Sequence, residues 1–144
     1  MDRIKIPIPE DFHFKTQIRI QIGDINYGGH LANDAYLRLA HEARLQMLQN
    51  FSWSEMDFEG YGLIMIDAGI QFMAEVFRGE SLTIEISLND LSQRGFNLYY
   101  HFRSAEGKSV AKIKTGMCFF DYASRRLAAL PVEIKEIIEQ RLRQ

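Results

Sequence analysis

GDINYGGHLANDAYLRLAHEAR, which spans residues 23–44, is the stretch that decides the fold. Its first seven residues, GDINYGG, combine glycine with aspartate and asparagine and therefore predict a loop. From residue 33 to residue 50, apolar side chains recur at helical spacing and cover more than half of the circumference. The main apolar stripe consists of Tyr36, Leu39, Ala40, Ala43 and Met47. We expect a helix that is buried by more than one neighbour and capped by Asn33 or Asp34.

Outside this helix the hydrophobic period is two, which is typical of strands. One strand is expected before the helix and four after it, at residues 15–22, 62–77, 81–89, 95–104 and 109–122. Residues 62–77 are apolar on both faces, so we expect a central strand that is covered on both sides. Short turns join the last four strands, which predicts an antiparallel meander.

Two shorter segments complete the expected secondary structure. Residues 52–60 are mixed in character and are expected to form one helical turn. Residues 131–143 are expected to form a closing helix with Pro131 in its first turn. The order of elements predicts an α+β protein, in which an antiparallel sheet of about five strands lies against a long helix.

The composition limits the classes of protein to consider. The chain of 144 residues has room for one domain, residues 1–144, with 47% hydrophobic and 25% charged residues. A formal net charge of −2 argues against a nucleic-acid partner. With no signal peptide, no apolar run long enough for a membrane span and a single cysteine, Cys118, we expect a cytoplasmic protein without a membrane partner. The 12% aromatic content predicts a tightly packed core and apolar surface for a subunit or a long ligand.

Several signatures of other enzyme classes are missing from the sequence. There is no G-x-S-x-G motif and no glycine-rich nucleotide loop. His41 and Glu42 begin like the zinc motif H-E-x-x-H, but position 45 is leucine. We therefore expect neither a metal nor a cofactor.

The quoted stretch, followed by four strands, resembles the hotdog fold and more closely the 4-hydroxybenzoyl-CoA thioesterase-like group of acyl-CoA thioesterases. In that family an Asp-x-Asp pair precedes a short loop, a His-Val-Asn-Asn segment and a helix tyrosine. Here Asp24 fits the first acid, residues 30–33 (HLAN) fit the histidine segment, and Tyr36 fits the tyrosine. The resemblance implies a thioester hydrolase acting on acyl-CoA or an acyl carrier protein. It also implies a homodimer or homotetramer with sites built between subunits.

The sequence departs from the family at Asn26, which occupies the place of the second acid. An amide cannot act as a base, although it can orient water or donate to an oxygen. The remaining candidates for a base or a water-positioning group are Asp24, His30, Glu42 and Asp67. Asp67 is the only charged residue between residues 62 and 73, where an unpaired carboxylate is costly.

Binding roles follow from the same resemblance. Backbone N–H groups near Asn33 are expected to hold the thioester carbonyl oxygen, since a helix N-terminus offers free donors. Gly28 and Gly29 leave room for close approach of the thioester, Tyr36 lies beside it, and Arg94 is expected to contact phosphates of coenzyme A.

Two alternatives remain open at this point. A hydratase or dehydratase can use the same fold, although GDINYGGH has one residue more than the hydratase motif between Asp24 and His30. A non-catalytic acyl-CoA-binding protein is the other alternative, because Asn26 replaces the usual carboxylate.

Overall fold

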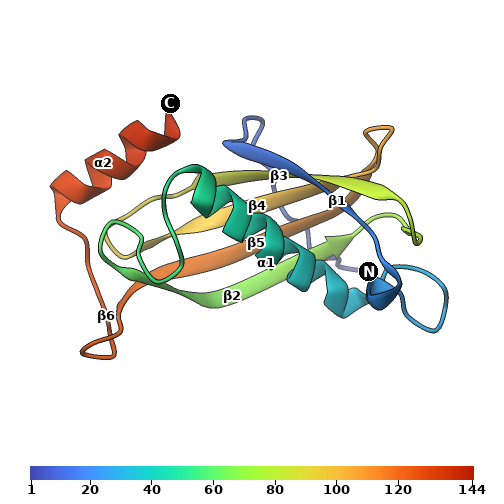
Figure 1. Cartoon of the computed structure of the whole chain (residues 1–144), viewed down its shortest axis with the longest axis horizontal. Coiled ribbons are helices and arrows are strands. Elements are labelled where there is room, and N and C mark those ends of the chain that lie inside the picture. The colour runs from blue at the N-terminus through green and yellow to red at the C-terminus, as the bar shows by residue number, and fades with distance from the viewer.

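An antiparallel sheet wraps around one long helix in the computed structural model, which describes all residues from 1 to 144 (Figure 1). The helix is α1 (Asn33–Asn50), with the predicted bounds. The strands are β1 (Phe14–Arg19), β2 (Gly62–Phe72), β3 (Ser81–Asn89), β4 (Gly95–Arg103), β5 (Ser109–Asp121) and the short β6 (Arg126–Leu127). A 3-10 helix, η1 (Ile22–Asp24), follows β1, and α2 (Val132–Leu142) closes the chain. The predicted α+β architecture is confirmed, although Pro131 is the N-cap of α2 and not part of its first turn.

The place of β2 in the sheet differs from the prediction. The strand order is β1-β3-β4-β5-β2, so β2 pairs only with β5 and forms an edge. Only β3, β4 and β5 make a meander, because the chain crosses over after β2 and pairs β3 with β1. On the open edge, Met65 is 42% exposed and Ile66 is 60% exposed. The apolar character of both faces therefore marks an uncovered edge strand and not a central one.

The end of β2 also lies earlier than predicted. The N–H groups of Met73 and Ala74 both donate to the carbonyl oxygen of Val110, at 2.9 and 3.1 Å, and the ladder with β5 stops there. Residues 73–80 form an irregular connection to β3 instead of continuing the strand. This connection lies at the same end of the molecule as the loop before α1 (Figure 1).

Alternation along the strands sends one row of side chains toward α1. Buried apolar residues of this row include Leu82, Ile84, Ile86, Leu98, Tyr100, Phe102, Ile113 and Phe119. On α1, Ala35, Ala40 and Ala43 are fully buried, and their small side chains let the helix approach the sheet closely. Residues 52–60 form no helical turn, because Phe58 inserts into this core beside Trp53, with ring centroids 4.3 Å apart.

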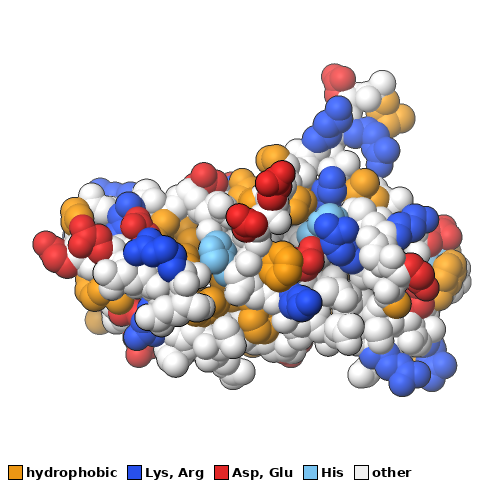
Figure 2. Space-filling view, turned by 90° about the horizontal axis from the view of Figure 1, so that it is seen from above, with side chains coloured by type: hydrophobic (Ala, Val, Ile, Leu, Met, Phe, Trp, Pro, Cys, Tyr) orange, Lys and Arg blue, Asp and Glu red, His pale blue; other side chains and the backbone are white.

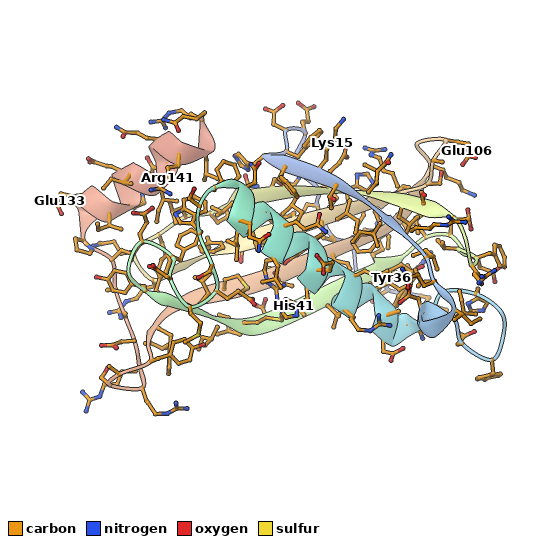
Figure 3. The ribbon with its side chains drawn as sticks, in the orientation of Figure 1. Lys15, Tyr36, His41, Glu106, Glu133 and Arg141 are labelled. Carbon is orange, nitrogen blue, oxygen red and sulfur yellow. The ribbon has the colours of Figure 1, made fainter.

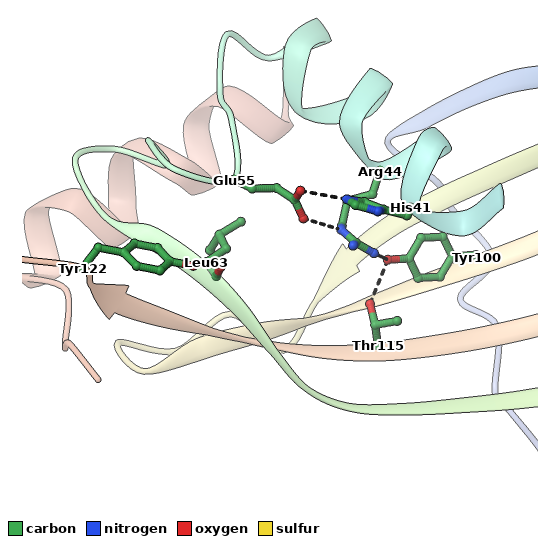
Figure 4. Close-up of polar contacts among 7 residues, drawn as sticks. All are labelled: His41, Arg44, Glu55, Leu63, Tyr100, Thr115 and Tyr122. Atoms are coloured by element: carbon green, nitrogen blue, oxygen red, sulfur yellow. Dashed lines mark hydrogen bonds and ion pairs between the residues drawn. The ribbon is translucent and has the colours of Figure 1, made fainter. Parts of the chain in front are cut away.

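A chain of polar side chains crosses the core beneath the middle of α1 (Figure 4). Arg44 is only 4% exposed, and its Nε donates to Glu55 Oε2 at 3.1 Å while its Nη1 donates to the Tyr100 hydroxyl at 3.0 Å. The Tyr100 hydroxyl also lies 2.8 Å from Thr115 Oγ1, and His41 Nε2 lies 2.9 Å from Glu55 Oε1. Each buried polar group in this chain therefore has a partner, which offsets the cost of its burial.

The opposite face of the sheet carries the N-terminal arm, residues 1–13. The N–H of Ile6 donates to Gln71 Oε1 at 3.0 Å, and the Ile6 side chain is buried against the β2 side of the sheet. Figure 2 shows acidic and basic side chains interspersed over one face of the molecule, as the small net charge implies. Neither α1 nor α2 has the length and hydropathy to cross a membrane.

Candidate active site

Helix α1 begins without a side-chain cap. Its N-cap is Ala32, so the predicted capping by Asn33 or Asp34 is wrong; Asn33 is already the first helical residue. The N–H of Ala32 donates to the carbonyl oxygen of Asp24 at 2.9 Å, and that of Ala35 donates to the carbonyl oxygen of Ala32 at 3.0 Å. The N–H groups of Asn33 and Asp34 have no acceptor in the chain. Two donors at the positive end of the helix dipole thus stay available for an oxygen atom of a ligand.

A pocket of about 270 Å³ opens beside this end of the helix. Its walls come from the end of the loop before α1, the first turns of α1 and the chain after β2, namely His30, Leu31, Asn33, Tyr36, Phe72, Met73, Ala74 and Glu75. A hydrogen bond of 2.7 Å from the N–H of Leu31 to the carbonyl oxygen of Val76 ties these segments together. The structure therefore brings together three of the predicted site residues, His30, Asn33 and Tyr36.

Tyr36 lines the pocket from the N-terminal half of α1 (Figure 3). Its ring meets Phe72 edge-to-face, with centroids 5.2 Å apart, and packs against Phe102 with centroids 5.7 Å apart. Burial, aided by the negative charge of Glu80, raises the pKa of Tyr36 to about 12. The phenol keeps its proton at neutral pH and remains a donor for a ligand.

The loop before α1 places Asn26 and His30 around Gly28. Asn26 Oδ1 accepts a hydrogen bond of 2.9 Å from the N–H of Gly28, and the N–H of Asn26 donates to the carbonyl oxygen of His30 at 3.0 Å. A Cβ on Gly28 would lie 3.2 Å from Asn26 Oδ1 and 3.3 Å from His30 Nε2, so a side chain there would crowd both groups. Gly29 has a φ of +86°, which favours glycine.

Asp24 is buried, and it lies outside the pocket lining. One carboxylate oxygen accepts the N–H of Gln21 at 2.9 Å, and the other accepts Arg38 Nη1 at 2.8 Å. Both oxygens are therefore occupied in shaping η1 and in fixing it to α1. Because the carbonyl oxygen of Asp24 also holds Ala32, this residue shapes the start of the helix from behind.

Asp67 lies on the sheet face opposite α1, and its side chain is 56% exposed. A register shift between Met65 and Asp67 turns the carboxylate to that side, where Oδ1 accepts Lys114 Nζ at 2.7 Å and the N–H of Gly116 at 2.9 Å. The hydrogen bond from Lys114 is the main reason that the pKa of Asp67 lies below its usual range. Within one chain the structure does not bring Asp67 to the pocket.

Two other candidates also lie elsewhere. Arg94 lines a separate cavity of about 210 Å³ beside Ile66 and Cys118. Glu42 accepts Gln46 Nε2 at 2.9 Å on the exposed side of α1. Neither side chain lines the pocket at the helix end.

Glu75 is the one charged residue that lines the pocket, and the sequence alone does not point to it. It is exposed and follows Met73 and Ala74 in the irregular connection after β2. The sequence signal is that Glu75 is the first carboxylate after a long apolar run, but the alternating pattern assigns residues 73–77 to the strand. The pocket therefore holds one carboxylate, one imidazole and one carboxamide beside the free helix donors. No cluster of three or more His, Cys, Asp or Glu side chains that could hold a metal ion is present.

Known proteins resemble this chain in sequence and in structure. A family model, the Thioesterase-like superfamily, matches residues 20–138, and the chain belongs to this superfamily. The 1,4-dihydroxy-2-naphthoyl-CoA thioesterase Slr0204 from Synechocystis superposes with a TM-score of 0.77 at 20% identity, over 90% of this chain and 94% of that chain.

Two structures from Staphylococcus aureus are also similar. The protein SAV2348, solved in complex with CoA, has a TM-score of 0.80 at 14% identity and covers 96% of this chain and 89% of that chain. A DHNA-CoA thioesterase has a TM-score of 0.77 at 15% identity, over 88% and 90% of the two chains. The expected hotdog fold is thereby confirmed.

Proposed function

We propose that this member of the superfamily hydrolyses a thioester of coenzyme A, or of an acyl carrier protein, in the pocket at the start of α1. The observation that carries the proposal is the pair of free N–H groups at the start of α1, on Asn33 and Asp34. Of the two residues, Asn33 lines the pocket, together with His30 and Glu75. Similar proteins whose names include thioesterase activity support the same class of reaction.

The chemistry requires donors for an oxyanion. Water attacks the thioester carbonyl carbon, and negative charge develops on the carbonyl oxygen. The N–H groups of Asn33 and Asp34 stabilise that oxygen, and the tetrahedral intermediate then expels the thiolate and leaves a carboxylic acid. The thiolate takes a proton, so the products are the acid and a free thiol.

The attacking water needs a base and a fixed position. Glu75 is the pocket carboxylate, and we assign to it the removal of a proton from water. His30 and Asn26 lie around Gly28 and orient the water or the thioester. The acyl group lies against Tyr36 and Phe72, which give the pocket its apolar wall.

A second copy of the chain would complete this site. The free edge of β2 exposes Ile66, and Phe72 and Met73, which line the pocket, are 39% and 45% exposed. An apolar edge strand with unpaired backbone groups is suited to pairing with another strand. We therefore propose a homodimer formed through β2, in which the partner covers the open side of the pocket.

Hydrolysis of a panel of aliphatic and aromatic acyl-CoA thioesters, followed by release of the free thiol, tests the function. Glu75→Gln should lower kcat by about 10²- to 10⁴-fold, as expected for loss of a general base. Glu106→Gln, which changes an exposed carboxylate in the turn between β4 and β5, is the matched control and should keep full activity. Equal rates for both variants would remove Glu75 from the mechanism.

The same panel separates the alternatives. Binding of acyl-CoA without thiol release would identify a non-catalytic binding protein. A change in enoyl-CoA absorbance without thiol release would identify a hydratase.

Sedimentation of Ile66→Lys tests the dimer, because a charge on the free edge should yield monomers. An unchanged dimer would rule out the β2 interface.

A further inference from the structure

A second hollow lies close to the pocket and is flanked by two arginines. It has a volume of about 420 Å³ and is lined by Arg19, Ile20, Gln21, Ile22, Arg78 and Gly79. Arg19 is the last residue of β1, and Arg78 belongs to the connection between β2 and β3. A hydrogen bond of 2.9 Å from the N–H of Gly79 to the carbonyl oxygen of Ile20 holds the two segments together. The arginines are thus presented from neighbouring backbones on one rim.

Neither arginine is neutralised by the chain. Arg38, Arg44, Arg103 and Arg141 each pair with a carboxylate. Arg19 and Arg78 take part in none of the ion pairs or side-chain hydrogen bonds of the molecule, and no acidic residue lines their hollow. Two positive charges with open donors therefore face the same space.

The hollow adjoins the proposed active site along the chain. Glu75 lines the pocket and Arg78 lines the hollow, so their Cα atoms are at most about 11 Å apart over three residues of extended chain. The end of β1, the connection after β2 and the start of α1 all lie at one end of the molecule (Figure 1). A ligand that entered the pocket with one end could reach the arginines with the other.

We propose that Arg19 and Arg78 bind the phosphate groups of the pantetheine carrier whose thioester lies in the pocket, an assignment that rests on the proposed function. Arginine suits this task because its planar guanidinium donates paired hydrogen bonds to phosphate oxygens. A pantetheine arm separates the thioester from the phosphate in coenzyme A and also in an acyl carrier protein. The two carriers share this chemistry, and the experiment distinguishes them.

The test compares substrates that differ only beyond the pantetheine arm. One acyl group is presented on coenzyme A, on 3′-dephospho-coenzyme A, on an acyl carrier protein and on pantetheine without phosphate. The variants are Arg19→Gln, Arg78→Gln and the double variant. Arg126→Gln is the control, because Arg126 is an exposed arginine in β6, which pairs with the C-terminal end of β5 and does not line the hollow. Titration of free coenzyme A gives Kd independently of turnover.

Each single variant should raise KM for a phosphate-bearing carrier roughly tenfold, and the double variant roughly a hundredfold, with kcat nearly unchanged. Hydrolysis of the pantetheine thioester should not respond to any of the variants. The preference for the phosphate-bearing carrier should also shrink at high salt, since exposed charges are screened. A response limited to coenzyme A or to the carrier protein supports the site and identifies its carrier.

Unchanged KM values of the double variant for both carriers would overturn the arginine site while leaving the hydrolase intact. An equal loss with pantetheine would overturn it too, because that substrate carries no phosphate. If no thioester were hydrolysed, the proposed function would fail, and the titration would still decide the site. In that case alone, a Kd for coenzyme A that is weaker in the double variant supports the site, and an unchanged Kd contradicts it.

Discussion

In its middle, α1 carries a chain of polar groups with a partner for each buried member, whereas at its first turn the same helix leaves two backbone donors open. The first region is the chain of hydrogen bonds that links Arg44 to Glu55 and, through the Tyr100 hydroxyl, to Thr115 (Figure 4). We call it the closed region. The second region, which we call the open region, is the first turn of α1, where the N–H groups of Asn33 and Asp34 have no acceptor and Asn33 lines the pocket. A satisfied polar chain in a core contributes to stability and unique packing. Open donors next to a cavity contribute nothing to stability and are instead available for a ligand. Mutations should therefore separate the two regions.

The largest expected effect is on stability, in the closed region. Arg44→Met removes the charge that pairs with Glu55 and leaves the Tyr100 hydroxyl with one partner fewer. Removing one partner of a fully buried ion pair costs about 3–5 kcal/mol, and the loss here should lie near the lower figure, because the Glu55 side chain is 28% exposed and keeps its contact with His41. Urea unfolding should show this loss, while kcat of the folded fraction stays near that of the wild type. A fall in kcat at unchanged stability would contradict the assignment of Arg44 to stability and not to catalysis.

The next effect is on catalysis, in the open region. Asn33→Pro removes one free N–H donor, and proline is tolerated in the first turn of a helix. Ala32 has φ −73° and ψ 148°, a conformation that a residue before proline adopts readily. Loss of one oxyanion donor should lower kcat about 10²- to 10³-fold.

Asn33→Ala is the matched control for this prediction, because it removes the same side chain and keeps the N–H. The two variants should have nearly equal melting temperatures and very different kcat values. Equal kcat values would show that the backbone donor has no part in the reaction.

The pH dependence of stability gives a smaller effect. Burial alone would raise the pKa of Glu55, but hydrogen bonds and charge from His41 and Arg44 hold it below its ordinary value. A carboxylate whose pKa is lower in the folded state stabilises the protein fully at pH values above its unfolded-state pKa, which is 4.5 for Glu. This contribution disappears as the pH falls from that value through the folded pKa. Urea unfolding of wild type and Glu55→Gln should therefore converge in acid and diverge at neutral pH.

The smallest effect is expected at the exposed ion pair on the other face of the sheet. Asp67→Asn removes the bond to Lys114, but surface pairs contribute only about 0–1 kcal/mol. Thermal unfolding should detect a shift of no more than a few degrees. If kcat fell sharply while stability held, Asp67 would belong to a site that two copies of the chain build together.

Local pattern and spatial neighbours differ in how well the sequence predicts them. The bounds of α1 and β3 agree with prediction, because helical spacing and strict alternation are local signals. The edge position of β2 was missed, since a run that is apolar on both faces fits a covered strand and an edge reserved for another subunit equally well. Periodicity identifies a strand without identifying its neighbours.

The site was predictable only where the family motif and the local chain coincide. His30, Asn33 and Tyr36 lie within a few residues of one another and line one pocket. The partner of Asp67 is 47 residues away in the sequence, so its distance from the pocket could not be anticipated. Glu75 was missed for a related reason, because only the end of the β5 ladder shows that the chain leaves the sheet there.

The free edge of β2 also affects how readily the protein aggregates and how its stability depends on protein concentration. An uncovered strand that exposes Met65 and Ile66 is a template for any other strand, including those of partly unfolded chains. A newly made chain is therefore prone to aggregate through this edge. If a second copy covers this edge, mass action makes the melting temperature rise with protein concentration, and dilution lowers it.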